Sequence, residues 1–190
     1  ILLFYLGYNI TVFAGNFETL FVGWEFLGIT SFLLIAFFRD RYLPVKNALK
    51  TISLYRLGDI CLILALWTSH HIWHENITFI QLNNQITVNE HIANNYPSVV
   101  FLLCMIIVTA SIKSAQFPFS SWLSRAMEGP TPSSAVFYGS LSVHLGVFLL
   151  MRTFSYWESI TFIKWLIISI GISTAIVASL IASVQSTVKT

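Results

Sequence analysis

Long apolar segments separated by short polar connections run through the whole chain. An α-helix needs about 20 consecutive, mostly apolar residues to cross a bilayer. Complete spans are predicted at 17–38, 44–68, 97–123, 131–152 and 160–185, and residues 1–14 form a partial helix that is too short to span. Residues 69–96 form a long loop between two of these spans. The pattern therefore predicts one all-α domain, a polytopic transmembrane helix bundle.

Composition supports a membrane protein. The chain is 56% hydrophobic and 9% charged, with a mean hydropathy of +0.75, whereas soluble domains carry about a quarter charged residues. A net charge of +2 without any basic run gives no indication of nucleic-acid binding. Cys61 and Cys104 lie in apolar segments, so free, buried thiols are expected. The chain has neither an initiator methionine nor a signal-peptide pattern, which indicates a fragment.

Lysine and arginine predict the orientation, because cytoplasmic connections are enriched in both. Basic residues lie in alternate connections, in 39–46, in 124–130 and after the last span: Arg39, Arg41, Lys46, Arg125 and Lys189. The loop at 69–96 holds none, whereas Arg152 and Lys164 count against the scheme. We therefore expect 39–46, 124–130 and the C-terminal segment on the cytoplasmic side.

The stretch 111–122, SIKSAQFPFSSW, places Lys113 and Pro118 at the end of an apolar run. A charge at the bilayer centre costs about 2.5–3.5 kcal/mol on insertion scales. Pro118 removes a helix hydrogen bond and clashes with the carbonyl of Ser114, so we expect a helix break there, with nearby serines and Gln116 bonding the freed backbone groups. A helix broken beside an ionisable residue is typical of a transport site. In the alternative, Lys113 reaches the interface and Pro118 simply ends the helix.

Other ionisable residues also lie in apolar spans. Glu25 is near the middle of its span. Arg56 and Asp59 are three residues apart and share a helix face, where they can pair for a structural or a functional reason. Lys50 lies on another face of the same helix, nearer the cytoplasmic end. His144 is near mid-depth and is either a proton relay or a hydrogen-bonded packing residue.

The segment SHHIWHEN, residues 69–76, places His70 and His74 four apart, a spacing compatible with metal ligation on a helix. Its order differs from the HExxH zinc motif. Trp67 and Trp73 instead favour an interfacial aromatic belt, so we predict no metal site. The chain also lacks a phosphate-binding glycine loop, a CxxC pair and a nucleophile elbow. We therefore expect no cofactor and no redox chemistry on this chain itself.

Four blocks resemble a known family: GWEFLGITSFLLIAFF, NALKTISLYRLGDICLILAL, KSAQFPFSSWLSRAMEGPTPSSAVFYGSL and ASVQSTVKT. They are similar to the proton-translocating antiporter-like membrane proteins. That family includes chain 5 of NADH:quinone oxidoreductase, the large subunit of Mrp-type sodium/proton antiporters and the membrane partner of a bicarbonate-uptake system. The resemblance covers nearly the whole chain, apart from the loop at 69–96.

The resemblance implies an inverted-repeat fold of which this chain supplies the first repeat. It implies an integral protein of the bacterial plasma membrane or the mitochondrial inner membrane. Its partners would be the lipid bilayer, other membrane subunits of a complex, and protons or sodium ions. Glu25 would form an ion pair with Lys113, a proton carrier at the break of a discontinuous helix. Lys50, Arg56 and Asp59 match the charged block around LGD.

One departure from the family pattern concerns the helix after GPTP. Many members carry a histidine early in that helix, where this chain has Tyr138. His144 comes six residues later, about 120° around the helix and about 9 Å along it. His144 therefore does not replace the missing group in place, and the link from Lys113 toward the centre of the protein is altered.

These inferences favour proton translocation by a chain 5-like subunit through a buried Glu25–Lys113 pair. Burial disfavours a charged lysine and a nearby carboxylate favours it. If Glu25 moves away, toward a neighbouring subunit or Arg56, Lys113 releases its proton. The alternatives are a Mrp-type cation/proton antiporter subunit, a membrane subunit of a bicarbonate-uptake complex, and an inert scaffold. The scaffold is disfavoured because an inert anchor gains nothing from a costly buried pair.

Overall fold

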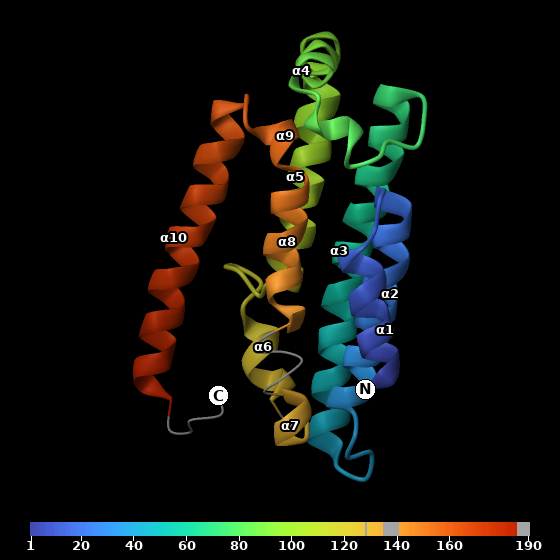
Figure 1. Ribbon diagram of the computed structural model, residues 1–190. Helices are drawn as coiled ribbons and strands as arrows, with labels where there is room; N and C mark the ends of the chain where they lie inside the picture. Colours follow the sequence, from blue (N-terminus) through green and yellow to red (C-terminus); the bar gives the residue numbers. More distant parts are fainter. Residues whose placement is uncertain (128, 135–140, 186–190) are drawn as a thin grey trace.

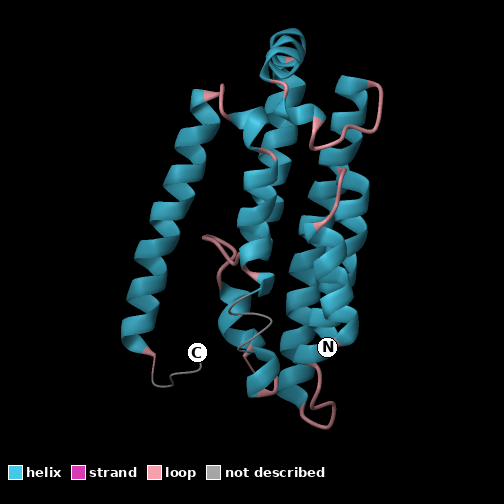
Figure 2. Cartoon of the chain, in the orientation of Figure 1, coloured by secondary structure: helices cyan, strands magenta, loops and turns pink. Residues whose placement is uncertain are grey.

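A computed structural model describes residues 1–127, 129–134 and 141–185 (Figure 1). The described part is helical and contains no strand, only one isolated bridge between Asn16 and Thr78 (Figure 2). The helices are α1 (Leu2–Val12), α2 (Phe17–Ile35), α3 (Tyr42–Trp73), η1 (Gln81–Asn83), α4 (Gln85–Asn94), α5 (Tyr96–Lys113), α6 (Ser121–Ala126), α7 (Thr131–Ser133), α8 (His144–Arg152), α9 (Phe154–Trp157) and α10 (Thr161–Val184). The predicted all-α bundle is confirmed.

Three helices are long and apolar enough to cross a membrane among the residues described, namely α2, α5 and α10. At 1.5 Å per residue, α3 is about 48 Å long, which exceeds the hydrocarbon core of about 30 Å by about 18 Å. The ends of α3 therefore reach beyond the core even when the helix spans it.

The predicted element boundaries differ from the observed ones in two places. The loop expected at 69–96 contains the end of α3, then η1 and α4. The segment at 97–123 is divided into α5 and α6 by a non-helical link. The segment at 131–152 is described only at its two ends, as α7 and α8, and Tyr138 lies outside the described residues.

The helix pairs α3–α5 and α1–α2 pack most extensively, with α2 against α3 and α8 against α5. Small residues permit the close approach of backbones. The hydroxyl of Thr109 on α5 donates to the carbonyl of Gly58 on α3 at 2.9 Å. Gly146 on α8 lies so close to α5 that a Cβ there would collide with the Ala110 carbonyl and the Ser114 hydroxyl. These contacts lock α5, the broken helix, between α3 and α8.

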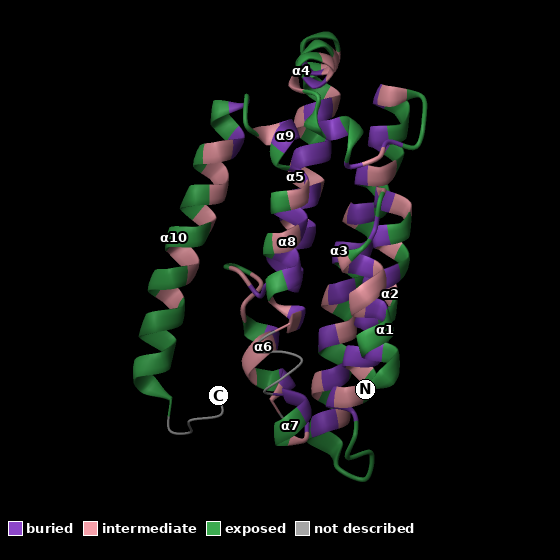
Figure 3. Cartoon of the chain, viewed as in Figure 1, coloured by how far each residue is buried: buried purple, intermediate pink, exposed green. Residues whose placement is uncertain are grey.

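The two ends of the bundle differ in the connections that they carry. The 36–41 connection lies at the same end as α6 and α7, whereas α4 and α9 lie at the opposite end (Figure 1). This arrangement agrees with the grouping of the 39–46 and 124–130 connections inferred from the basic residues. Along most of its length α10 is exposed in this chain, and only Ile163 is buried (Figure 3).

Candidate functional site: a buried lysine at a helix break

The break begins where α5 ends, at Lys113. Ser114 caps the helix, its N–H donating to the Ala110 carbonyl at 2.8 Å. Ala115 then adopts a left-handed conformation with φ 51°, which a non-glycine residue enters only at a cost. The helix was predicted to break at Pro118. In the structure it ends five residues earlier, because the left-handed turn at Ala115 has already redirected the chain.

Polar groups around the break bond the backbone that the interrupted helix leaves free. The indole N–H of Trp122 on α6 donates to the Ile112 carbonyl at 2.9 Å. The Phe117 N–H donates to the hydroxyl of Thr174 on α10 at 3.0 Å. The hydroxyl of Ser114 donates to the carbonyl of Val143, just before α8, at 2.7 Å. The break is therefore held from α6, α8 and α10 together.

Lys113 is buried at this break, with a relative exposure of 2%. Its Nζ lies 4.4 Å from the centre of the Tyr55 ring and 4.9 Å from that of the Trp24 ring. Within the described part of the chain, Nζ has no hydrogen-bond acceptor. The alternative in which Lys113 reaches the interface is therefore wrong, because its amine points into an aromatic box.

Three charged residues form a chain beside this box. Nη1 of Arg56 lies 2.7 Å from Oε2 and 3.0 Å from Oε1 of Glu25. The same atom lies 3.4 Å from Oδ2 of Asp59, which confirms the expected pairing of Arg56 with Asp59. Glu25, Asp59 and Arg56 are all close enough to act electrostatically on Lys113. The site is thus a lysine, two carboxylates and a guanidinium contributed by α2, α3 and α5.

The expected direct ion pair between Glu25 and Lys113 is not formed in this structure. The two ion pairs among the described residues both involve Arg56, and the carboxylate of Glu25 is engaged there. Nη1 of Arg56 lies within hydrogen-bond distance of both Glu25 oxygens, whereas Nζ of Lys113 lies over the rings of Trp24 and Tyr55. Glu25 is therefore a neighbour of Lys113 and a partner of Arg56.

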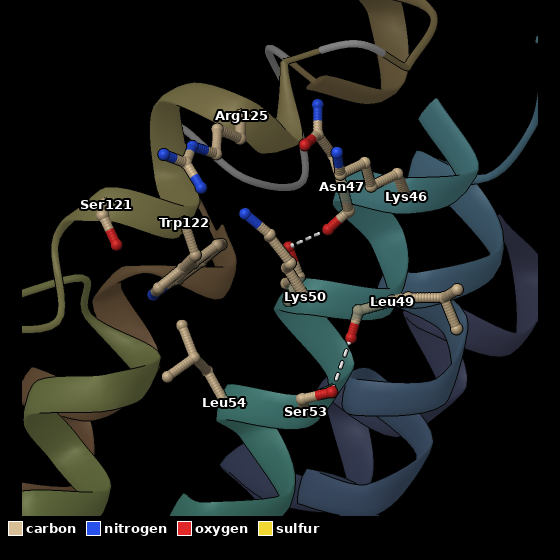
Figure 4. A pocket seen from close by; sticks show the side chains of 10 residues that line it. Lys46, Asn47, Leu49, Lys50, Ser53, Leu54, Ser121, Trp122 and Arg125 are labelled. Carbon is tan, nitrogen blue, oxygen red and sulfur yellow. Dashed lines mark hydrogen bonds between the residues drawn. The ribbon is translucent and has the colours of Figure 1, made fainter. Parts of the chain in front are cut away.

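Two predicted proton-path residues lie apart from this group. Lys50 lines a separate pocket with Lys46 and Arg125 (Figure 4). His144 begins α8 and is exposed, so the structure does not place it against Lys113. Their participation in transport stays a prediction.

Side chains of the histidine-rich segment, residues 69–76, make contacts with neighbouring aromatic rings. The rings of Trp67 and His71 stack with their centres 5.9 Å apart, and Trp73 lies 4.1 Å from His91. Residues 1–127, 129–134 and 141–185 contain no group of three metal-ligating side chains placed to hold an ion. Cys61 and Cys104 are free thiols, as expected, but they are half-buried and not buried as the sequence predicts.

Sequence reasoning missed two features of the site region. The aromatic box of Trp24 and Tyr55 was not anticipated, although Trp24 directly precedes Glu25. Arg152 was counted as a loop charge, yet its Nη2 donates to the carbonyls of Val12 at 2.9 Å and Ala14 at 3.2 Å. Arg152 thereby caps the end of α1, a role that only the tertiary structure reveals.

An all-α integral membrane protein with a discontinuous helix and a buried lysine at the break is the class that this geometry defines. Residues 14–190 match the family described as NADH:quinone oxidoreductase/Mrp antiporter, transmembrane. The chain belongs to this family.

Relatives support the same membership. NADH-ubiquinone oxidoreductase chain 5 of Yarrowia lipolytica is 34% identical over 95% of this chain and 27% of its own length. Chain 5 of Lumbricus terrestris is 35% identical over 100% of this chain and 30% of its own length. The Mrp complex structure from a Dietzia species superposes with a TM-score of 0.88 at 26% identity, covering 98% of this chain and 20% of that one. The chain thus spans less than a third of the length of these relatives.

Proposed function

We propose that this chain carries a switched proton site of a proton-translocating membrane subunit similar to chain 5 of NADH:quinone oxidoreductase. The observation that carries the proposal is the placement of Lys113, which is 2% exposed, lacks an acceptor among the described residues and lies within the electrostatic reach of two carboxylates. A charged group at membrane depth is costly, and it persists where it serves transport.

The switch is the choice of partner made by Glu25. When Glu25 turns to Lys113, its negative charge compensates the ammonium and the proton is retained. When Glu25 is held by Arg56, as at 2.7 Å in this structure, the ammonium depends on Asp59 and on the two ring faces alone. Desolvation then favours the neutral amine, and the proton leaves. Arg56 therefore acts as the competing partner that draws Glu25 away.

The helix break supplies the exit beside the amine. Between Lys113 and Ser121 the backbone is non-helical, so the link begins at the residue that carries the proton. Irregular backbone at membrane depth is tolerated where protein buries it or where it lines a water-filled cavity. The proton passes from Lys113 to water at this link.

The direct test compares Lys113→Ala with Lys164→Ala in the full-length protein within its complex. Both variants remove one lysine from a helix, but Lys164 lies near the start of α10, away from the break. Proton uptake into inverted vesicles should be abolished by Lys113→Ala and preserved by Lys164→Ala, with equal amounts of protein in the membrane. Wild-type uptake by the Lys113→Ala variant would refute the proposal.

The partners are proposed to be the other membrane subunits of a redox-driven complex. Because the Mrp complex structure superposes with a TM-score of 0.88, a cation/proton antiporter subunit is the second candidate. A native gel of solubilised source membranes separates the two. Migration of the chain with a very large NADH-oxidising band supports the redox-driven complex, whereas a smaller assembly without that activity supports the antiporter.

A further inference from the structure

A pocket of about 380 Å³ lies between the first half of α3 and the short helix α6, away from the proton site. Its lining combines cationic and apolar side chains, among them Lys46, Lys50, Arg125, Leu49, Leu54 and Trp122 (Figure 4). In the close view, the amine of Lys50 and the guanidinium of Arg125 turn toward the same space between the two helices. The proposed proton mechanism uses neither of these groups.

The charged side chains that line this pocket are all positive, and its neutral polar side chains include Asn47 and Ser121. Within the described ranges, neither Lys50 nor Arg125 has a carboxylate partner, since both ion pairs there belong to Arg56. The hydroxyl of Ser53 is already bonded to the Leu49 carbonyl at 2.8 Å. The indole N–H of Trp122 is engaged by the Ile112 carbonyl. A ligand that satisfies this set of donors is an anion.

The position of the pocket along α3 indicates which kind of anion binds there. Lys46 and Lys50 lie about 6 and 12 Å from the start of α3 at Tyr42. Because α3 exceeds the hydrocarbon core by about 18 Å, its first turns can lie at the depth of the lipid headgroups. This end of the bundle also carries the 36–41 connection with Arg39 and Arg41, as expected for a cytoplasmic face.

Apolar side chains also line the pocket. Leu49 is 53% exposed and lies next to the cations, so a ligand there has a charged end and an apolar body. Basic pockets between membrane helices on the cytoplasmic side are suited to phospholipid headgroups. We propose that the Lys46–Lys50–Arg125 pocket binds the phosphodiester headgroup of an anionic phospholipid, with its acyl chains along Leu49 and Leu54.

The test uses the intact complex containing the full-length chain, reconstituted in phosphatidylcholine nanodiscs. A photoactivatable phosphatidylglycerol is added, and the labelled peptides are identified by mass spectrometry. Labelling of the peptide containing Leu49 and Leu54 should fall about tenfold in Lys50→Gln/Arg125→Gln, equivalent to about 1.4 kcal/mol. Lys164→Gln, which removes one charge near the start of α10, should leave the labelling unchanged and is the matched control for Arg125→Gln.

Two control experiments accompany this labelling test, one with a charge-preserving variant and one with a different lipid probe. The charge-preserving variant Lys50→Arg/Arg125→Lys should retain the labelling, and photoactivatable phosphatidylcholine should give background only. If the double glutamine variant fails to assemble, Arg125→Gln against Arg125→Lys carries the same comparison. Equal labelling in all variants would overturn the proposal. Suppression of the labelling by millimolar inorganic phosphate would assign the pocket to a free anion, and crosslinking of this face to a protein segment would assign it to that segment; either result also overturns the lipid proposal.

Discussion

The amine of Lys113 lies 4.4 Å from the centre of the Tyr55 ring, while the nearby carboxylate of Glu25 is bonded to Arg56. A ring face stabilises a cation by about 0.5–2 kcal/mol, less than a close carboxylate does in a desolvated site. With Glu25 held by Arg56, the ammonium is supported by Asp59 and by the two ring faces. In the proposed mechanism, the approach or withdrawal of Glu25 then decides whether the proton is kept.

Removal of the competing partner should trap the proton. Arg56→Gln frees Glu25 to approach Lys113, so the ammonium becomes better compensated and proton release slows. We expect proton uptake in vesicles to fall about tenfold or more, with the protein still inserted. Arg41→Gln, which removes an exposed arginine outside the site, is the control. Unchanged uptake by Arg56→Gln would show that the hold on Glu25 has no part in transport.

The ion pair between Arg56 and Glu25 should also contribute to the free energy of unfolding. Arg56→Gln leaves two carboxylates without their guanidinium, and we expect a loss of about 1–2 kcal/mol in the free energy of unfolding, between the values for exposed and buried pairs. Glu25→Gln combined with Arg56→Gln should cost less than the sum of the two separate losses, because each change alone already removes the 2.7 Å ion pair. Unfolding in mixed detergent micelles measures the cycle, and strictly additive effects would contradict the coupling.

Gly28 controls the space beside the Lys113 amine. A Cβ at Gly28 would lie 3.9 Å from Nζ of Lys113 and 3.8 Å from the Tyr55 ring, which is ordinary contact. Gly28→Ala should therefore transport normally. Gly28→Leu extends into the aromatic box and should reduce proton uptake about tenfold, since overpacking costs about 1–3 kcal/mol. Equal rates of proton uptake by both variants would show that a leucine at position 28 does not disturb the aromatic box.

Gly146 should be intolerant of any side chain. A Cβ there collides with the Ala110 carbonyl, which is backbone and cannot swing aside. Gly146→Ala should cost about 1–3 kcal/mol in the free energy of unfolding. Gly171→Ala is the matched control, because no atom lies within 4 Å of a Cβ at Gly171 and alanine favours a helix. A Gly146→Ala protein as stable as the control would disprove the close packing of α8 on α5.

Trp122 should stabilise the break through its indole N–H. Trp122→Phe keeps a ring against Tyr55 but leaves the Ile112 carbonyl without its 2.9 Å donor. We expect a loss of about 0.5–1.5 kcal/mol, measured by thermal unfolding in detergent. Trp165→Phe, at a side chain that is 66% exposed, should be neutral. A neutral Trp122→Phe would mean that the carbonyl finds another donor.

The helices themselves could be predicted from the sequence with little ambiguity. Long apolar runs have one stable solution in a membrane, because the backbone must bond within its own segment. The break near Lys113 was also predictable, although its position was not. Pro118 lies in the link, but the helix already ends at Lys113 and the chain turns at the left-handed Ala115, a conformation that an alanine in a sequence does not predict.

Contacts between helices were harder to predict. The pairing of Arg56 with Asp59 follows from a spacing of three residues on one helix. The stronger contact of Arg56 with Glu25 joins residues 31 positions apart, so it depends on how α2 and α3 are rotated against each other. The helix α4 was missed for a different reason. Its sequence, QITVNEHIAN, is too short and polar to stand out from a loop.

The hydrogen bond from the Phe117 N–H to Thr174 ties α10 to the chain four residues after Lys113. Because most of α10 is exposed in this chain, its outer side is available to a neighbouring subunit. A displacement of α10 within an assembly would therefore act on the backbone of the break through this hydrogen bond as well as through the packing of α10 on α5. If Lys113 releases a proton as proposed, a subunit packed on α10 would act on that release from outside the bundle.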